Sequence, residues 1–261
     1  MIVRATPSSF VYLTQTDHAR ASGRLAEHWP RAHFPAPARR ADVLLAIHEH
    51  DRGWQPLDAA PFWNSETQAP YSFLDFPTSP KLVHYRAGLD EVEALAPYAG
   101  LLCSRHYADF FNPAEPGAAA EFLAHEQRRQ QRLKTWLDLT PGPAEDALEY
   151  HLQLLKFCDR LSLYLCLNEP GASKAAEHPW YRAGIPGSDF FAHTGHQLLQ
   201  AAWLAPDRVQ LAPFPFAQEF EVTLPYRELP RVQVRQLGLA RSLAAAPEQQ
   251  LRVRISSPDA A

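Results

Sequence analysis

The spacing of apolar residues changes near residue 170, and this change limits the folds that the chain can adopt. Residues 144–168 carry a helical stripe with members three or four positions apart: Leu148, Leu152, Leu155, Asp159, Ser162 or Leu163, and Cys166. After residue 170, four segments alternate apolar and polar side chains, which predicts half-buried antiparallel strands: residues 208–214, 220–226, 231–237 and 251–256. We therefore expect a mainly α protein, in which residues 1–170 form a helical domain and residues 171–261 form a β-rich cap packed on it.

A short hairpin and a series of helices are expected before residue 170. Residues 1–4 and 10–14 have a β-rich composition around a turn-prone TPSS segment, so we expect this hairpin to join the strands of the cap. Thr16 or Asp17 can cap the first helix through a side-chain oxygen. Further helices are predicted over four ranges besides 144–168: residues 39–52, 81–96, 98–111 and 115–138. The proline-rich residues 55–80 are expected to be an irregular functional loop or lid.

Composition excludes several classes of partner. With 261 residues, of which 46% are hydrophobic, the chain can bury a full core. A formal net charge of -4 gives no positive field for nucleic acid or an anionic membrane, which favours a small diffusible substrate. The sequence lacks a long apolar run and a signal-peptide pattern, so we expect a soluble, cytoplasmic protein. The three cysteines show no Cys-x-x-Cys spacing and are expected to be buried, reduced thiols.

Ionisable residues occupy helical faces that otherwise resemble a core. Burying an ionised aspartate such as Asp159 without a partner costs several kcal/mol, so it needs a cation, a hydrogen-bond network or a metal. Neutral imidazoles and carboxylates are ligands for iron, zinc and manganese, and separate helices can supply them to the core of a bundle. The candidate ligands of one or two divalent metals (Fe, Mn or Zn) are His18, His50, Asp51, His84, His106 and Asp159.

The order of these residues resembles that of the HD superfamily of metal-dependent phosphohydrolases. The matching segments are TDHARASGRLA around His18, AIHEHDRGW around the doublet His50-Asp51, and LLKFCDRLSLYLC around Asp159. His84 and His106 fill the positions that the dinuclear branches of the superfamily show, and those branches include phosphonate-cleaving oxygenases and myo-inositol oxygenase. The resemblance covers roughly residues 15–168 and implies an HD-like helical bundle. The whole chain is also similar to an uncharacterised bacterial family of about this length.

The chain departs from the family pattern directly after the doublet. Arg52, Gly53 and Trp54 stand where the superfamily usually has a small apolar residue followed by glycine and lysine. Nothing in the chain matches the second signature of the cyclic-dinucleotide branch. The resemblance therefore implies metal binding and leaves the substrate open.

Each candidate ligand also has a simpler interpretation. His50, Asp51 and Asp159 could form a buried hydrogen-bonded group that holds helices together without metal. His18 or His106, taken alone, could be a core histidine, and Asp90 could share a helix face with His84.

Neighbours of the doublet supply further candidates. His48 competes with His50 as a ligand, but His50 is adjacent to Asp51, so His48 and Glu49 are assigned as candidate catalytic bases or as residues that orient ligands. His193 and His196 have metal-like spacing but follow a different segment, and are interpreted as surface or capping residues.

Four cations lie next to a candidate ligand or within one helical turn of it. Arg52, Arg105 and Lys156 are the candidates for holding a phosphate or carboxylate of the substrate, and Lys156 is the strongest because it precedes Asp159 by three residues. A surface role is at least as good an interpretation for Arg160. Trp29 and Trp54 are expected to form pocket walls, with core packing as the alternative.

These features lead to one leading hypothesis and two alternatives. The leading one is a phosphohydrolase acting on phosphomonoesters or phosphodiesters through a mononuclear or dinuclear metal site. The first alternative is an HD-type diiron oxygenase acting on a small polar or phosphonate substrate. The second is a non-catalytic HD-like ligand-binding protein. In each case the expected partner is a small phosphorylated or anionic molecule, and neither nucleic acid nor a membrane is expected.

Overall fold

The computed structural model describes residues 1–114 and 116–258. The α-helices are α1 (Gln15–Glu27), α2 (Arg40–Glu49), α3 (Gln55–Ala59), α4 (Thr78–Leu95), α5 (Pro97–Ala108), α6 (Ala118–Trp136), α7 (Pro143–Leu167), α8 (Arg231–Leu237) and α9 (Leu239–Ala245). The strands are β1 (Ile2–Ala5), β2 (Ser9–Leu13), β3 (Trp63–Asn64), β4 (Ala69–Pro70), β5 (Gln200–Ala205), β6 (Arg208–Ala212), β7 (Phe220–Pro230) and β8 (Glu248–Ser256). The short 3₁₀ helices are η1 (Arg31–His33), η2 (Pro37–Arg39), η3 (Arg52–Trp54), η4 (Lys174–Ala176), η5 (Pro179–Tyr181), η6 (Ser188–Phe190) and η7 (Ala192–Thr194). The protein is mainly α with an N-terminal hairpin and a β-rich C-terminal part, as predicted.

Helix ends follow local capping chemistry. Thr14 has an extended backbone, and its hydroxyl oxygen accepts the Asp17 N–H at 2.9 Å, so α1 begins two residues earlier than a cap at Thr16 would allow. α7 begins with Pro143, whose missing N–H costs nothing in a first turn, and it buries most of its length. α2 ends at Glu49, which leaves the doublet beyond the helix.

One sheet contains both ends of the described chain. Its strand order is β1-β2-β7-β8-β6-β5, and all neighbours are antiparallel except β6 and β8. β2 pairs with β7, with Phe10 opposite Leu229, so the predicted junction between the N-terminal hairpin and the later strands is confirmed.

The strand predicted at residues 231–237 is wrong, because this segment is α8. The partner strand β2 begins at Ser9, opposite Pro230, so the segment after Pro230 has no strand to pair with there. A short run with alternating valines fits a helix as well as a strand, and here local propensity decides.

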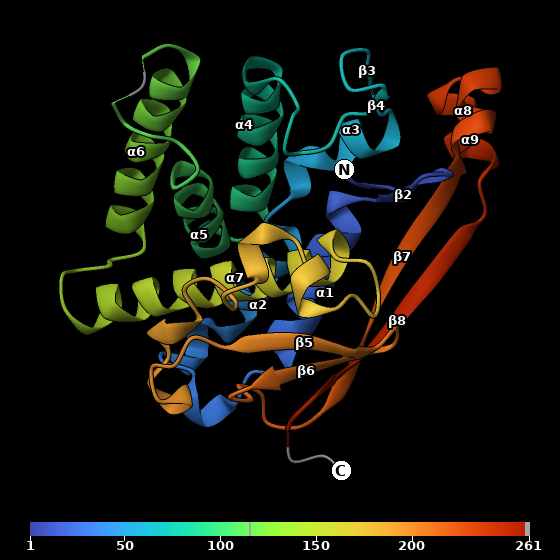
Figure 1. Ribbon diagram of the computed structural model, residues 1–261. Helices are drawn as coiled ribbons and strands as arrows, with labels where there is room; N and C mark the ends of the chain where they lie inside the picture. Colours follow the sequence, from blue (N-terminus) through green and yellow to red (C-terminus); the bar gives the residue numbers. More distant parts are fainter. Residues whose placement is uncertain (115, 259–261) are drawn as a thin grey trace.

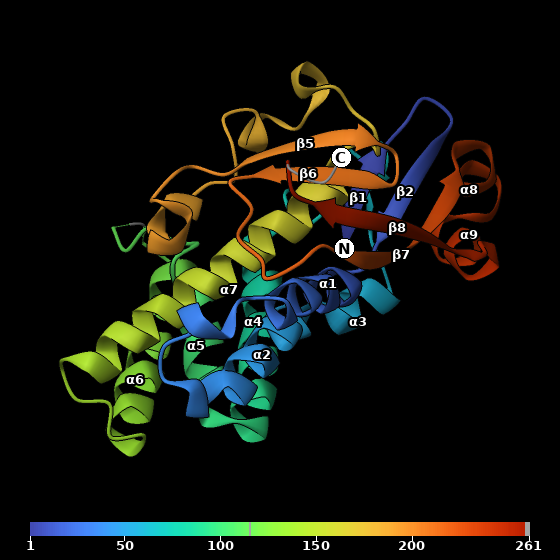
Figure 2. The same ribbon diagram turned by 90° about the horizontal axis from the view of Figure 1, so that it is seen from below.

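Helices α1 and α7 connect the sheet to the other large helices. α1 packs on α2, α7 and β7, and α7 also contacts β1. Figure 1 shows α4, α5 and α6 on the side of α7 away from β5 and β6, and Figure 2 shows α7 crossing the molecule diagonally toward the sheet. Buried hydrophobic residues of the helices and of the sheet belong to a single cluster, in which the Trp29 ring lies 4.6 Å from that of Phe191.

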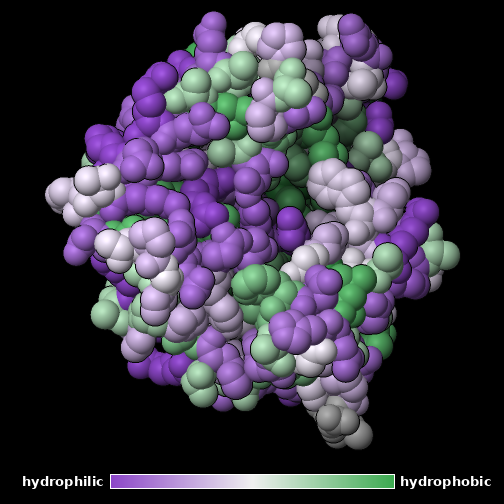
Figure 3. Space-filling model, turned by 90° about the vertical axis from the view of Figure 1, so that its left-hand side faces the viewer, coloured by the Kyte–Doolittle hydropathy of each residue, from purple (hydrophilic) through white to green (hydrophobic). Residues whose placement is uncertain are grey.

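The surface shows a mixture of hydrophilic and apolar residues. The face in Figure 3 is mostly hydrophilic, with hydrophobic residues visible in a hollow. Within residues 1–114 and 116–258, no helix has both the length and the apolar character needed to cross a bilayer.

Candidate metal centre

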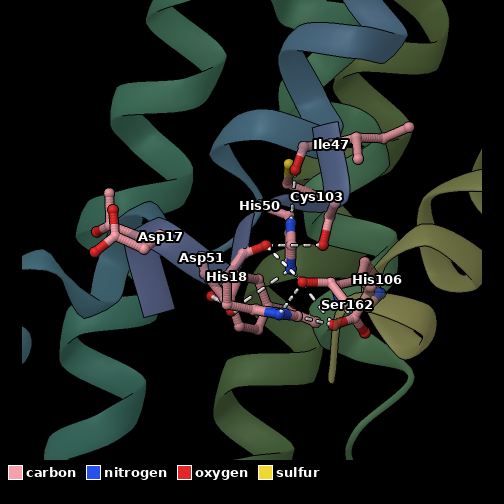
Figure 4. A network of polar contacts seen from close by, with 12 residues as sticks. Asp17, His18, Ile47, His50, Asp51, Cys103, His106 and Ser162 are labelled. Atoms are coloured by element: carbon pink, nitrogen blue, oxygen red, sulfur yellow. Dashed lines mark hydrogen bonds and ion pairs between the residues drawn. The ribbon is translucent and has the colours of Figure 1, made fainter. Parts of the chain in front are cut away.

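Five of the six predicted ligands converge in the interior. α1 supplies His18, the residues directly after α2 supply His50 and Asp51, α5 supplies His106, and α7 supplies Asp159. Each of them is at most 8% exposed. Figure 4 shows His18, His50, Asp51 and His106 turned toward one another, while Asp17 points away from them.

The end of α2 explains how two adjacent residues reach the same point. Neighbouring residues in a continuous helix point in directions about 100° apart. His50 is the C-terminal cap of α2, and Asp51 leaves the helix with φ -101° and ψ 21°. The bend brings His50 Nε2 and Asp51 Oδ2 to 3.5 Å from each other.

Two glycines allow α4 to approach this bend. A Cβ atom on Gly53 would lie 2.5 Å from the His84 carbonyl oxygen, and one on Gly88 would lie 2.5 Å from Gly53 Cα. Real Cβ atoms essentially never approach so closely, so only glycine permits this backbone contact. The unusual segment Arg52-Gly53-Trp54 therefore has a structural role beside the doublet.

The donor atoms face each other at short range. His18 Nε2 lies 2.9 Å from Asp159 Oδ1 and 3.7 Å from Asp51 Oδ2. His50 Nε2 lies 3.6 Å from Asp159 Oδ1, and His106 Nε2 lies 3.6 Å from Asp159 Oδ2. The other oxygen of Asp51 accepts a hydrogen bond from the Tyr107 hydroxyl at 3.0 Å. Three imidazoles are thus arranged around two carboxylates.

Hydrogen bonds orient two of the imidazoles. His50 Nδ1 donates to the Ile47 carbonyl at 2.8 Å. The Ser162 hydroxyl donates to the His18 carbonyl at 2.9 Å and accepts from His18 Nδ1 at 2.8 Å. In the neutral forms, both Nε2 atoms therefore direct lone pairs at carboxylate oxygens, which are also acceptors. Such an arrangement requires a shared proton or a cation, and buried His50 Nε2 has no hydrogen-bond partner among the described residues.

Burial and charge together set the protonation of the centre. Burial favours neutral His50, but Asp51 and Asp159 outweigh it and raise the pKa of His50 to about 9. Burial opposes ionisation of Asp159, yet the hydrogen bond from His18 and the nearby His50 and His106 imidazoles hold the pKa of Asp159 well below its usual value. For Asp51, burial dominates and raises the pKa although His50 and His18 oppose it. Burial lowers the pKa of His106 to about 3, so this imidazole is neutral.

The convergent atoms form two overlapping groups that could hold a metal ion. His18, His50 and Asp51 make up one, and His50, His106 and Asp159 the other, with ligand atoms within 4.8 Å of one another in each. His50 belongs to both. An imidazole nitrogen has one lone pair and binds one ion, and His50 Nδ1 is already used as a donor. The five residues therefore fit a single ion better than two.

The structure does not bring His84 into either group. This histidine is half-buried on α4, and its backbone carbonyl packs on Gly53. His84 is thus the one predicted ligand that the structure does not group with the other five. The close packing of α4 against η3 determines its position instead.

The two candidate catalytic bases point away from the centre. His48 covers Gly23 of α1, and its Nε2 lies 3.2 Å from Glu27 Oε1. Glu49 accepts from Arg52 at 2.9 Å. Because both residues still belong to α2, the helix directs them away from the point that the doublet reaches after the bend.

The three predicted substrate-binding cations are paired with carboxylates. Arg52 pairs with Glu49 and Glu91, Arg105 with Glu149 at 2.6 Å, and Lys156 with Asp109. None of the three lines the pocket over the centre. Lys156 does precede Asp159 by one turn of α7, but its ammonium group pairs with Asp109, a partly exposed carboxylate at the end of α5.

A pocket of about 410 Å³ opens over the centre. His18, Asp51, His106 and Asp159 form part of its lining, and so does Trp54, as expected. Trp29 instead packs in the core against Phe157 and Phe191. His193 and His196 bond to backbone carbonyls, in line with their non-ligand interpretation.

The sequence analysis missed other residues of the site. Lys81, Gln15 and Tyr181 line the pocket, and Ser162 and Tyr107 orient ligand side chains. Lys81 could have been suspected, because it follows the proline-rich loop. Tyr181 lies beyond residue 170, and no motif around it in the sequence predicts that it lines the pocket.

Comparisons with known proteins give one match. A search of curated proteins finds no match, and a search of solved structures finds none either. A family model matches residues 1–231, which include all five residues of the candidate centre. Because this match covers most of the 261 residues, the chain belongs to the family described as "Protein of unknown function (DUF3891)".

Proposed function

We propose that the protein is a phosphohydrolase that depends on one divalent transition-metal ion (Mn, Fe or Zn). The supporting observation is the convergence of His50 Nε2, which is buried and lacks a hydrogen-bond partner among the described residues, with two carboxylates and two further imidazoles. When bound, such an ion lowers the pKa of a coordinated water and neutralises charge on phosphoryl oxygens. The ligands would be His18, His50, Asp51, His106 and Asp159.

The remaining residues of the centre hold these ligands in place. Ser162 and the Ile47 carbonyl fix the ring orientation of His18 and His50 by accepting their Nδ1–H groups. Tyr107 binds one oxygen of Asp51 and leaves the other directed at the imidazoles. Partners of this kind set the tautomer and the basicity of metal ligands.

The shared His50 favours a hydrolase over a diiron oxygenase. A dinuclear centre needs separate donors for each ion, whereas both candidate groups use the same imidazole and His84 lies in neither. His106 and Asp159 line an open pocket, which suits the hydrolase and the ligand-binding alternative equally and argues only against a purely structural role for the centre. The shared His50 therefore favours the hydrolase over the oxygenase, and a measurement of hydrolysis separates the hydrolase from the ligand-binding protein.

The proposal includes a small phosphorylated or anionic substrate and a cytoplasmic location. The three cysteines are buried and unpaired, which is usual in a reducing compartment. A net charge of -4 gives no general attraction to nucleic acid or to an anionic membrane.

Metal content and phosphatase activity of matched variants test the proposal. Manganese-supplemented wild-type protein is expected to retain about one equivalent of metal and to hydrolyse 4-nitrophenyl phosphate. Asp51→Asn and Asp159→Asn should lose both properties. Asp109→Asn, a half-exposed aspartate that pairs with Lys156, should retain both. Circular dichroism identifies any variant that fails to fold.

Three other outcomes would contradict the proposal or favour one of its alternatives. Equal metal content in wild type and in both site variants contradicts the metal site. Metal binding without hydrolysis of any phosphate ester supports the ligand-binding alternative. About two equivalents of iron with a mixed-valent electron paramagnetic resonance signal supports the oxygenase instead.

A further inference from the structure

The pocket over the centre has an apolar wall and an apolar mouth. Aromatic rings from separate parts of the chain line it, including Trp54, Tyr85, Phe110 and Trp180. At its mouth, Leu74 is 50% exposed, Phe110 53% and Trp180 47%. Large apolar side chains grouped at the opening of a pocket favour a ligand whose own apolar part can cover them.

Two cations line this pocket and form no ion pair with a carboxylate among the described residues. Of the four lysines in the chain, Lys134, Lys156 and Lys174 form ion pairs with carboxylates. Lys81 makes no ion pair among the described residues, and its Nζ lies 3.4 Å from the Phe73 carbonyl. Arg160 donates to the Pro186 carbonyl at 2.9 Å. Both therefore keep their charge available to an anion.

The charges of the lining favour a dianion. Its charged side chains are Asp51, Asp159, Lys81 and Arg160. The two carboxylates cancel the two cations, so a bound divalent ion would leave a formal charge of +2. A phosphate monoester dianion neutralises this charge fully, whereas a phosphodiester carries only one negative charge.

Two buried polar atoms in the lining lack partners. Gln15 Oε1 and Tyr181 Oη are buried and have no hydrogen bond with any described residue. Tyr181 is 1% exposed and Gln15 is 3% exposed. An unpaired buried polar atom costs about 1–3 kcal/mol, so a bound molecule that pairs with these atoms recovers that cost. These two atoms add uncharged hydrogen-bonding groups to the charged part of the pocket.

We propose that the pocket binds phosphate monoesters of aromatic or other apolar alcohols, with Lys81 and Arg160 as cationic partners of the phosphate and Tyr181 as a hydrogen-bond donor to it. The aromatic wall covers the apolar part of the alcohol. This inference rests on the proposed phosphohydrolase for the reaction, while the binding site itself depends only on residues of the pocket.

Binding of two phosphonates tests the inference without catalysis. Phenylphosphonate and methylphosphonate carry the same phosphonate head group and no ester bond, and they are compared at an alkaline pH at which both are dianions. Isothermal titration calorimetry on manganese-supplemented protein should give at least about tenfold tighter binding of phenylphosphonate, because only its ring can pack on the aromatic wall. Lys81→Met should weaken phenylphosphonate binding by about tenfold or more. The matched control Lys134→Met, a lysine that pairs with Glu145 away from this pocket, should leave it unchanged.

The outcomes separate this inference from the proposed function. Equal affinity for the two phosphonates, or an unchanged affinity in Lys81→Met, overturns the inference even if the protein hydrolyses phosphate esters. Tight, Lys81-dependent binding of phenylphosphonate without any hydrolysis overturns the proposed function and keeps the binding site. If both hold, 1-naphthyl phosphate should have a higher kcat/KM than glycerol phosphate or bis(4-nitrophenyl) phosphate. A preference for either of the last two contradicts the substrate class.

Discussion

Buried histidines in this protein differ in what their two ring nitrogens contact. In His18 and His50, Nδ1 donates to a nearby acceptor and Nε2 faces carboxylates. In His151, Nε2 donates to the Pro35 carbonyl at 3.0 Å, and Nδ1 accepts from the Tyr98 hydroxyl at 2.7 Å. His151 is thus fully satisfied as a neutral ring, whereas the other two need a cation or a proton. Sequence periodicity predicts whether a helical histidine is buried, but it does not separate these roles.

His151 should make stability depend on pH. Burial lowers the pKa of His151 to about 4, whereas an unfolded histidine titrates near 6.5. Between these values the unfolded chain binds more protons, so stability falls as the pH drops below about 6.5. The free energy of unfolding, measured with urea, should decrease by about 2 kcal/mol more in wild type than in His151→Gln between about pH 7 and about pH 5.

An exposed histidine provides the control for this measurement. His125 has a side chain that is 45% exposed, so His125→Gln should follow the wild-type pH dependence. If wild type and His151→Gln lose the same stability over this range, His151 does not remain neutral in the folded protein.

The sequence does not predict which residues form hydrogen bonds with the candidate ligands. Ser162 contacts His18 across 144 positions of the chain, and Tyr107 contacts Asp51 across 56. Local patterns predict which face of a helix is buried, but not which residue of another helix lies opposite. The structure brings five of the six predicted ligands together, and their binding of metal stays a prediction.

At the level of elements, helices were easier to predict than short strands. The predicted ranges of the five larger helices after the first lie within a few residues of α2, α4, α5, α6 and α7. Each has enough turns for the helical period to be distinct. The segment at residues 231–237 is seven residues long, and whether it becomes a strand depends on an available partner strand.

Gly88 provides a test of the contact between α4 and η3. Replacing an exposed helical glycine with alanine normally stabilises a protein by about 1 kcal/mol. At Gly88 the new Cβ would meet the backbone of Gly53, so Gly88→Ala should instead lower the free energy of unfolding by about 1–3 kcal/mol. Because η3 directly follows Asp51, the variant should also retain less manganese.

The sign of the change in the free energy of unfolding of Gly88→Ala shows whether helix propensity or the contact between α4 and η3 has the larger effect. Ala87→Ser alters an exposed neighbour in the same helix and should change stability by less than about 0.7 kcal/mol. A Gly88→Ala protein as stable as wild type would mean that α4 can move away from η3 without loss.

On the scale of the whole molecule, helical and β-rich parts share one core. The sequence predicts a boundary near residue 170 from its change of period, and secondary structure does change there. However, β1 and β2 complete the C-terminal sheet, and the pocket wall contains both Trp54 and Trp180. Arg4 of β1 donates to the carbonyl groups of Cys166 and Asn168 at the end of α7. These long-range contacts leave no periodic signal along the chain.

The shared core predicts that the helices and the sheet unfold together. Urea unfolding should give the same midpoint by circular dichroism at 222 nm, which reports helices, and by tryptophan fluorescence, to which Trp203 of β5 contributes. Val222 in β7 and Leu148 in α7 are both fully buried, so Val222→Ala and Leu148→Ala should each lower the free energy of unfolding by about 2 kcal/mol or more. For each variant, the midpoint measured by circular dichroism and the midpoint measured by fluorescence should shift by the same amount.

An exposed position on the same strand completes this test. Thr223 of β7 is exposed, so Thr223→Ala should leave both midpoints nearly unchanged. If Val222→Ala shifts only the fluorescence transition and Leu148→Ala only the circular dichroism transition, the chain consists of two independently stable units divided near residue 170. Coincident shifts require that α1 and α7 lose their packing when the sheet unfolds. The candidate metal centre, whose residues come from these helices and their neighbours, would then form only while the sheet is intact.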